Sequence, residues 1–276
     1  MIVMPPFSFL RFALLLLACA LQLSATAAAA SLQQIRQRGQ LVVGVSYVVP
    51  EYAAGAKYRT PEGFYIAAAE DLARRLGVTL RTVKVTAQNR RQLLAQGKVD
   101  LLLLNLKQAD ADTLRASATL LPTSYQARPK LIMRSDTDIK RIAQLRGRSV
   151  CVAQGGAYAG SMAASYGAVE KVVNAPADAL LALRTGACDA AVHDDAVLNG
   201  ILDLPEWKKF SATLPLDGSP ATLTFAVRPA DTGLAAYLQQ LNRGWSDSSY
   251  WVDNRKKWIN NVAFEVYLDQ NVPDCH

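Results

Sequence analysis

The run His193-Asp194-Asp195 places the only internal imidazole of the chain beside two carboxylates. Such a group can form a metal site, a catalytic dyad or an anchor for a ligand. One histidine with scattered acids does not supply the three or four ligands of a metal site, so we expect no metal and no cofactor. Asp194 closes an apolar run and can accept hydrogen bonds from a ligand ammonium group. One aspartate, preferably Asp195, should also cap the following helix, and His193 either contacts the ligand or packs in the core.

Two other features could hold an anion. The first is a loop between an expected strand and helix, formed by Gly155, Gly156 and Ala157. Amides at a helix N-terminus bind carboxylates or phosphates, although glycines in such a loop can also serve only the turn. The second is Arg115, which follows the carboxyl end of an expected strand and could clamp a carboxylate. Alternatively, Arg115 is a surface residue that forms an ion pair with Asp110 or Asp112.

Aromatic residues surround the loop after the first expected strand: Tyr47, Tyr52, Tyr58, Phe64 and Tyr65. Aromatic side chains there could wall a small-ligand pocket, or simply belong to the core. The sequence contains no G-x-S-x-G, H-E-x-x-H, P-loop or C-x-x-C motif. We therefore expect a binding protein and not an enzyme.

Strand-like and helix-like segments alternate along the chain, which predicts an α/β fold with mostly parallel sheets covered by helices. The expected strands are 41–48, 79–85, 99–106, 129–135, 149–155, 170–175, 189–194 and 222–228, and the expected helices between them are 67–77, 89–97, 138–147, 159–167 and 177–186. Two such units in tandem, followed by a helical end, predict two lobes. Ligands of these sheets bind at the carboxyl ends of strands, so two facing lobes form a cleft.

The first 30 residues have the order of a secretory signal: Arg11, an apolar run from Phe12 to Leu23, and an alanine-rich stretch. Lipid anchoring at Cys19 would leave a shorter apolar run than usual, so we expect a cleaved signal peptide and a periplasmic protein. After removal of this segment the net charge is about +6. Without a basic block, this excess does not indicate nucleic-acid binding. Export permits disulfides; Cys151 and Cys188 either form a bridge or are separately buried thiols.

Taken together, the chain resembles the periplasmic solute-binding proteins of polar amino-acid ABC transporters (bacterial extracellular solute-binding protein family 3) from about residue 33 to 258. Seven blocks carry the resemblance in order: LQQIRQRGQLVVGV, EGFYIAAAEDLARRLG, VTAQNRRQLLAQGKVDLLL, TLRASATLLPTSY, IKRIAQLRGRSVCVAQGG, CDAAVHDDAVLNG and DNRKKWI. The third block is similar to the glutamate/aspartate-binding branch.

The resemblance implies a two-lobed periplasmic-binding-protein fold (type II) that closes around a ligand by hinge motion. We expect lobe 1 at residues 31–134 and 223–276 and lobe 2 at 135–222. By resemblance, Arg115 grips the α-carboxylate of an amino acid, Asp194 binds its α-ammonium group, and the loop at 155–157 helps to hold the carboxylate. The expected partners are a small ligand, such as an amino acid or related carboxylate, and an ABC permease; the protein is expected to be a monomer.

Several positions depart from the family pattern. The approach to Arg115 holds Gln108, Asp110 and Asp112 in place of Ser or Thr, and the dicarboxylate branch has a basic residue where this chain has Ser46 and Tyr47. A second ligand carboxylate then has no clear partner, whereas a cationic side chain would suit the added acids. Two alternatives stay open: an accessory or sensor protein of an exported enzyme system, and an enzyme like the cyclohexadienyl dehydratases. Those enzymes carry a glutamate where this chain has Val197.

Overall fold

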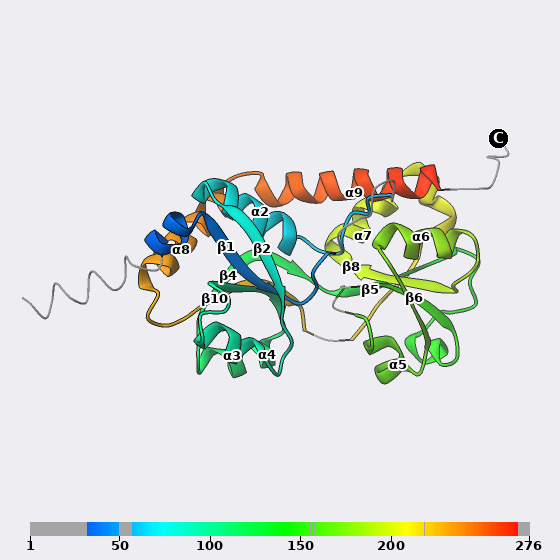
Figure 1. The fold of residues 1–276 in the computed structure, drawn as a ribbon. Coiled ribbons are helices and arrows are strands. Elements are labelled where there is room, and N and C mark those ends of the chain that lie inside the picture. Colours follow the sequence, from blue (N-terminus) through cyan, green and yellow to red (C-terminus); the bar gives the residue numbers. More distant parts are fainter. Residues whose placement is uncertain (1–31, 50–56, 155, 157, 218, 270–276) are drawn as a thin grey trace, which may run out of the picture.

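The computed structural model describes residues 32–49, 57–154, 156, 158–217 and 219–269. The expected signal peptide, Cys19, and the candidate site residues Tyr52, Gly155 and Ala157 lie outside these ranges. Within them the chain forms two five-stranded sheets with helices on their faces, so the predicted two-lobed α/β fold is confirmed (Figure 1).

The first lobe is built on a sheet with the strand order β2-β1-β3-β10-β4. Its strands are β1 (Gln40–Val45), β2 (Thr79–Lys84), β3 (Leu101–Leu106), β4 (Thr119–Ala127) and β10 (Ala221–Val227). Strands β1, β2 and β3 are parallel, and β10 runs antiparallel to both β3 and β4. The lobe's helices are residues 32–38, α2 (Tyr65–Leu76), α3 (Arg90–Ala95), α4 (Gln108–Arg115) and α8 (Thr232–Asp247).

The second lobe is built on a sheet with the order β7-β6-β8-β5-β9. Its strands are β5 (Pro129–Met133), β6 (Ser149–Ala153), β7 (Val169–Val173), β8 (Ala190–Asp194) and β9 (Ala212–Pro215). Its helices are α5 (Ser161–Tyr166), α6 (Pro176–Arg184) and α7 (Asp195–Leu202), with 3-10 turns at Ile142–Leu145 and Pro205–Phe210. A disulfide joins Cys151 of β6 to Cys188, which lies just before the neighbouring strand β8.

The chain passes between the lobes at different points from those expected. Strand β5, which the expected division placed in lobe 1, pairs with β8 and β9 in the second sheet. The crossing therefore lies at the short connection between β4 and β5, around Arg128. The chain returns to the first lobe between β9 and β10.

The last helix, α9 (Tyr250–Leu268), packs on both lobes (Figure 1). Near its start, the ring of Trp251 lies 5.6 Å from that of Tyr125 in the first lobe. Farther along, α9 packs on α6 and α7 of the second lobe, where Val262 and Val266 are buried. The expected division assigned this whole region to lobe 1; its apolar side chains instead complete the core of both lobes.

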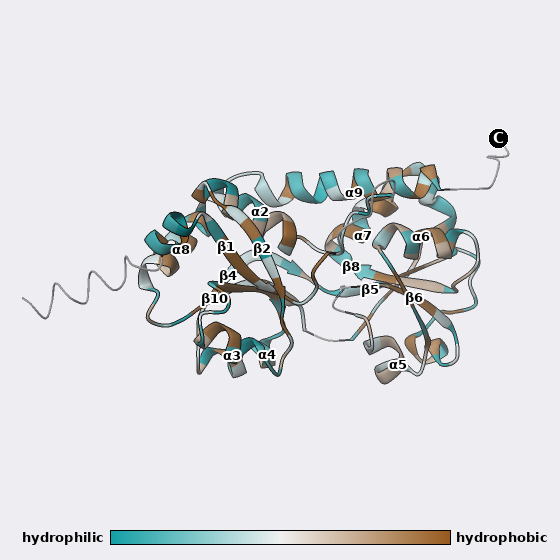
Figure 2. Ribbon diagram, in the orientation of Figure 1, coloured by the Kyte–Doolittle hydropathy of each residue, from teal (hydrophilic) through white to brown (hydrophobic). Residues whose placement is uncertain are grey.

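Each sheet is buried on both faces, which explains the continuous apolar runs of its central strands. In α8, the buried residues Leu234, Leu238, Leu241 and Trp245 recur at helical spacing and form one stripe against the sheet. Strands β1 and β10 are largely hydrophobic, whereas hydrophilic and hydrophobic residues alternate along helix α9 (Figure 2). None of the helices within the described ranges is long and apolar enough to span a membrane.

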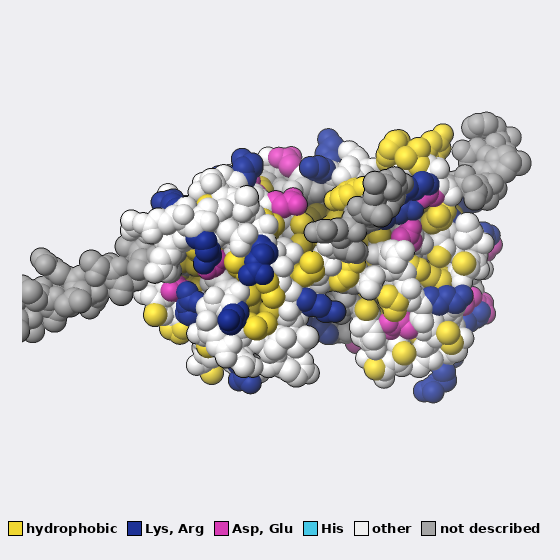
Figure 3. All heavy atoms as spheres, viewed as in Figure 1, with side chains coloured by type: hydrophobic (Ala, Val, Ile, Leu, Met, Phe, Trp, Pro, Cys, Tyr) yellow, Lys and Arg dark blue, Asp and Glu magenta, His cyan; other side chains and the backbone are white. Residues whose placement is uncertain are grey.

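On the face shown in Figure 3, Lys and Arg side chains are scattered over the first lobe and do not form one basic block. Apolar side chains gather over the far end of α9, where Phe264, Tyr267 and Leu268 are exposed.

Candidate functional site

A buried polar cluster lies where the two lobes meet. We call it the interlobe cluster, and its members are Glu62, Tyr125, Tyr158, His193 and Asp194. The first two belong to the first lobe and the other three to the second. All five are at most 9% exposed. A group of polar side chains at this depth must satisfy its hydrogen bonds internally or through a ligand.

Asp194 is the last residue of β8, and its carboxylate accepts hydrogen bonds from two tyrosines. The Tyr125 hydroxyl donates to Oδ2 at 2.9 Å, and the Tyr158 hydroxyl donates to Oδ1. Burial, followed by the nearby charge of Glu62, raises the pKa of Asp194 to about 6. Burial and the Asp194 charge raise the pKa of both tyrosines, so their hydroxyls stay protonated as donors. The Asp194 carboxylate is thus held by hydroxyl groups, with no cationic hydrogen-bond partner among the described residues.

Glu62 and His193 form the second half of the cluster. The His193 Nδ1 atom lies 3.0 Å from Glu62 Oε2, with side chains 1% and 4% exposed. An ionised carboxylate can only accept, so the imidazole tautomer with a proton on Nδ1 is the donor in this hydrogen bond. Glu62 Oε1 and His193 Nε2 are buried and have no protein partner among the described groups. Since His193 and Asp194 are consecutive in a strand, they point to opposite faces of the sheet, and the cluster therefore surrounds the end of β8.

Glu62 is held in place by the segment before α2. The Trp258 Nε1 of α9 donates to the Pro61 carbonyl at 2.9 Å, and the Thr60 N–H donates to Glu265 Oε1 at 3.0 Å. A Cβ atom at Gly156 would lie 3.2 Å from Glu62 Cγ, so a glycine there lets the second lobe approach this side chain closely. Sequence reasoning did not identify Glu62. The only sequence feature that could have indicated Glu62 is its place as the single acidic residue at the start of EGFY, after the loop that follows the first strand.

Two more buried polar groups lie on the Glu62 side. Burial and the Glu62 charge raise the pKa of Tyr65, and its hydroxyl has no hydrogen-bond partner among the described groups. The Asn105 Oδ1 atom of β3 is also buried and has no hydrogen-bond partner among the described groups. The Nδ2 atom of Asn105 lies 3.8 Å from the point where a Cβ of Gly63, next to Glu62, would lie.

Arg115, the predicted carboxylate clamp, is not brought to Asp194. Its side chain is 60% exposed and pairs with Asp112 on its own helix at 2.6 Å. It lines a groove of about 280 Å³ together with Pro122 and Gln126 of β4. Burial alternates along β4, with Tyr125 buried and Gln126 exposed, because successive strand residues point to opposite faces. Arg115 and the interlobe cluster therefore lie on opposite faces of β4. In this structure Arg115 forms the surface ion pair that was the alternative to a ligand contact.

Other predicted positions also have local partners. Asp110 pairs with Arg90 at 3.1 Å. Asp195, expected as the helix cap, lies in the first turn of α7, and its Oδ1 accepts the Arg128 N–H across the crossing at 3.0 Å; Asp194 occupies the cap position instead, without a side-chain cap bond. Tyr47 packs against the core.

Gly155 and Ala157 of the predicted carboxylate-binding loop lie outside the described residues, so the role of this loop stays a prediction. The Glu170 carboxylate of β7 accepts the N–H groups of Gly160 and Met162, the latter at 3.1 Å. These amides follow the predicted loop in sequence and belong to the start of α5, which is only six residues long. Gly156, the one described member of the predicted loop, lies beside Glu62 as noted above.

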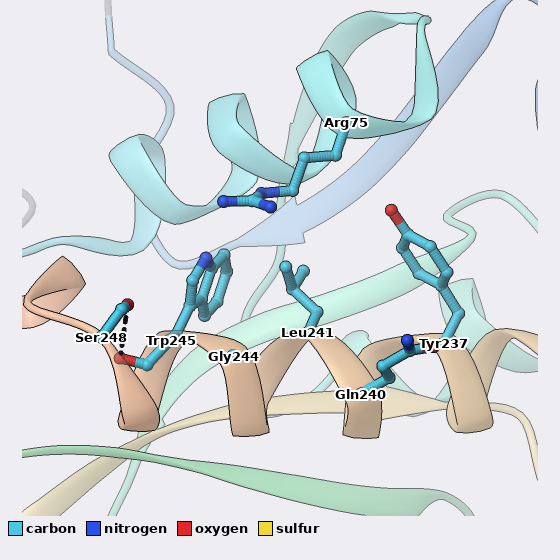
Figure 4. A pocket seen from close by; sticks show the side chains of 7 residues that line it. All are labelled: Arg75, Tyr237, Gln240, Leu241, Gly244, Trp245 and Ser248. Atoms are coloured by element: carbon cyan, nitrogen blue, oxygen red, sulfur yellow. Dashed lines mark hydrogen bonds between the residues drawn. The ribbon is translucent and has the colours of Figure 1, made fainter.

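A larger groove lies elsewhere, between α2 and α8 on the first lobe, with a volume of about 560 Å³. Figure 4 shows the Arg75 guanidinium pointing from α2 toward Trp245 and Leu241 of α8. Arg75 already pairs with Asp71 at 2.6 Å. The groove therefore presents no buried charge in need of a partner, unlike the interlobe cluster.

Residues 41–261 match the bacterial extracellular solute-binding proteins, family 3, and the chain belongs to this family. No curated protein matches its sequence at a significant level. Several solved structures have a fold similar to that of this chain. The ancestral amino acid-binding protein AncCDT-1, described as a precursor of cyclohexadienyl dehydratase, is 22% identical with a TM-score of 0.54, covering 83% of this chain and 99% of that one.

Two further structures share the fold. Holo ArgBP from T. maritima is 24% identical with a TM-score of 0.51, covering 82% of this chain and 98% of that one. The amino acid ABC transporter substrate-binding protein AbpA from Streptococcus pneumoniae, bound to L-arginine, is 18% identical with a TM-score of 0.55, covering 85% of this chain and 98% of that one. At these identities the likeness concerns the fold.

Proposed function

We propose that the protein is an exported, periplasmic solute-binding protein that captures a small ligand with an ammonium group between its lobes and delivers it to an ABC permease. The observation that carries this proposal is the state of Asp194: a fully buried carboxylate whose partners are two hydroxyls. A buried carboxylate without a cation is costly, and a ligand ammonium group donating to the free lone pairs would supply one.

Membership of an extracellular solute-binding family supports this proposal. So do the names of the structural relatives, two of which refer to amino acids and one to an arginine-bound state. Asp194 also lies at the carboxyl end of a strand, facing the other lobe, which is where α/β sheets bind ligands.

A second candidate is an accessory or sensor binding protein whose pocket has diverged from amino-acid transport. One observation favours it: Arg115, which was expected to hold a ligand carboxylate, pairs instead with Asp112 on its own helix. A dehydratase-like activity has no such support, because Val197 is 1% exposed and packs in the core.

A thermal-shift screen of amino acids and small amines tests the proposed function. A ligand at about 100 times its Kd raises the free energy of unfolding by about 2.7 kcal/mol, which corresponds to a melting-temperature increase of about 5–10 °C. Asp194→Ala should abolish the shift while retaining the native circular-dichroism spectrum. If no ammonium compound shifts the melting temperature, the proposed function is wrong; if Asp194→Ala still binds, the site is wrong.

A further inference from the structure

We propose that the ligand of the interlobe cluster is a small amine that lacks a carboxylate group, and that Glu62 binds a second cationic end of it. The inference rests on the proposed function, in which Asp194 binds an ammonium group, and it narrows the class of ligand. Three features of the described residues carry it: the engagement of Arg115 elsewhere, the unpartnered acceptors beside Glu62, and the charge of the cluster.

The first feature concerns the ligand carboxylate that an amino acid would bring. Arg115 lies beyond β4, on the face opposite to Tyr125, and pairs with Asp112. The amides at the start of α5 already bind the Glu170 carboxylate. A ligand carboxylate inside the cluster would instead face two buried acids, Glu62 and Asp194, and like charges at such depth are strongly unfavourable.

The second feature is the set of acceptors that have no donor. Glu62 Oε1 and Asn105 Oδ1 are both buried, and no described protein group donates to either. Glu62 is itself 4% exposed and its other oxygen is engaged by His193. The buried Tyr65 hydroxyl on this side also has no partner among the described groups, and it can accept a hydrogen bond as well as donate one. An alkylammonium group has three donors and no acceptor, so it can supply donors to these groups.

The third feature is charge. Two carboxylates, Glu62 and Asp194, share one imidazole, His193, which donates to Glu62 and not to Asp194. With both carboxylates ionised the cluster carries a net negative charge whether or not the imidazole is protonated. A ligand with two positive ends, one at each carboxylate, neutralises both without leaving a buried charge unpaired.

Calorimetric titration with matched pairs of compounds tests this inference on the wild-type protein. Each pair consists of an amino acid and the amine obtained by removing its carboxyl group: lysine with 1,5-diaminopentane, ornithine with 1,4-diaminobutane, and arginine with agmatine. We expect the amine to bind at least about tenfold more tightly than its amino-acid partner. Tighter binding of the amino acids would overturn this inference and leave the proposed function intact. Binding of neither class would overturn both.

Two variants test the assigned contacts. Glu62→Gln should weaken binding of a diamine by at least about tenfold, while binding of the monoamine of the same length changes little. Arg115→Ala is the matched control, and the diamine affinity should be unchanged in it. A loss of affinity in Arg115→Ala, or none in Glu62→Gln, would overturn the assignment. The wild-type comparison does not depend on either variant, and circular dichroism establishes that both are folded.

Discussion

At the scale of the residue, the cost of burying Asp194 is the central feature of the molecule. Its pKa of about 6 lies above the ordinary value of 3.8 because burial and the neighbouring Glu62 disfavour the charged form. Tyr125, Tyr158 and His193 offset part of this cost through their hydrogen bonds and charge. The ligand-free protein therefore keeps an ionised side chain at neutral pH that weakens its own fold, as binding sites often do.

Asp194→Asn should therefore stabilise the ligand-free protein at neutral pH. Between about pH 4 and pH 6 the folded wild-type protein binds more protons than the unfolded chain, so the Asp194 contribution to stability falls as the pH rises through this range. At pH 7.5 the ionised group costs up to about 3 kcal/mol. The variant's melting temperature should exceed that of wild type at pH 7.5, and the difference should shrink at pH 4.5. A difference that grows toward low pH would contradict this account.

Glu62 and His193 should be energetically coupled. His193→Ala leaves the buried Glu62 carboxylate without its donor, which costs about 3–5 kcal/mol. Adding Glu62→Ala removes the stranded charge, so the double variant should be less destabilised than the sum of the single variants, with a coupling of about 1–3 kcal/mol. Urea unfolding of the four proteins at pH 7 measures this. Additive effects would mean that the two side chains do not stabilise one another.

The sequence predicted part of this site. Asp194 was identified because it ends an apolar strand and matches the family motif. The structure does not bring Arg115 to Asp194, because a sequence motif does not specify on which face of β4 a neighbouring side chain lies. Glu62 was missed because its partner His193 lies 131 residues away in the chain, and a pairing across lobes leaves no local pattern.

At the scale of the element, alternation and glycine positions predicted the parallel strands well. The expected strand 189–194 appears as Ala190–Asp194, and the helix expected to end at Gly77 ends at Leu76, with Gly77 at φ 72°. Helix α4 and strand β4 were not predicted as elements. The α4 segment is almost entirely polar, with only Leu114 buried, and β4 contains Pro122; both signals are typical of loops, and tertiary packing overrides them.

The disulfide between Cys151 and Cys188 should stabilise the second lobe. It joins residues 37 apart in sequence, for which the chain-entropy model gives about 4 kcal/mol. Dithiothreitol should lower the urea midpoint of the wild-type protein toward that of a Cys151→Ala, Cys188→Ala variant, and should leave the variant unchanged. Equal midpoints with and without the reductant would show that the bridge contributes little.

At the scale of the whole molecule, the two lobes are joined by more than the crossing strands. Helix α9 packs on both, and the interlobe cluster ties Glu62 and Tyr125 of one lobe to His193 and Asp194 of the other. A ligand that binds Asp194 must therefore enter between surfaces that already contact each other. Hinge motion is the means by which such proteins admit ligands, and closure around the ligand would exclude water from the cluster.

The most direct test of the central claim is the number of protons released when a diamine binds. An ammonium group beside Asp194 stabilises the ionised carboxylate, so binding should lower the pKa of Asp194 from about 6. Calorimetric titrations at pH 6 in two buffers of different ionisation enthalpy should give a release of about half a proton per ligand. The release should vanish at pH 8 and in Asp194→Asn. Binding at pH 6 without proton release, or with the same release in Asp194→Asn, would contradict the account.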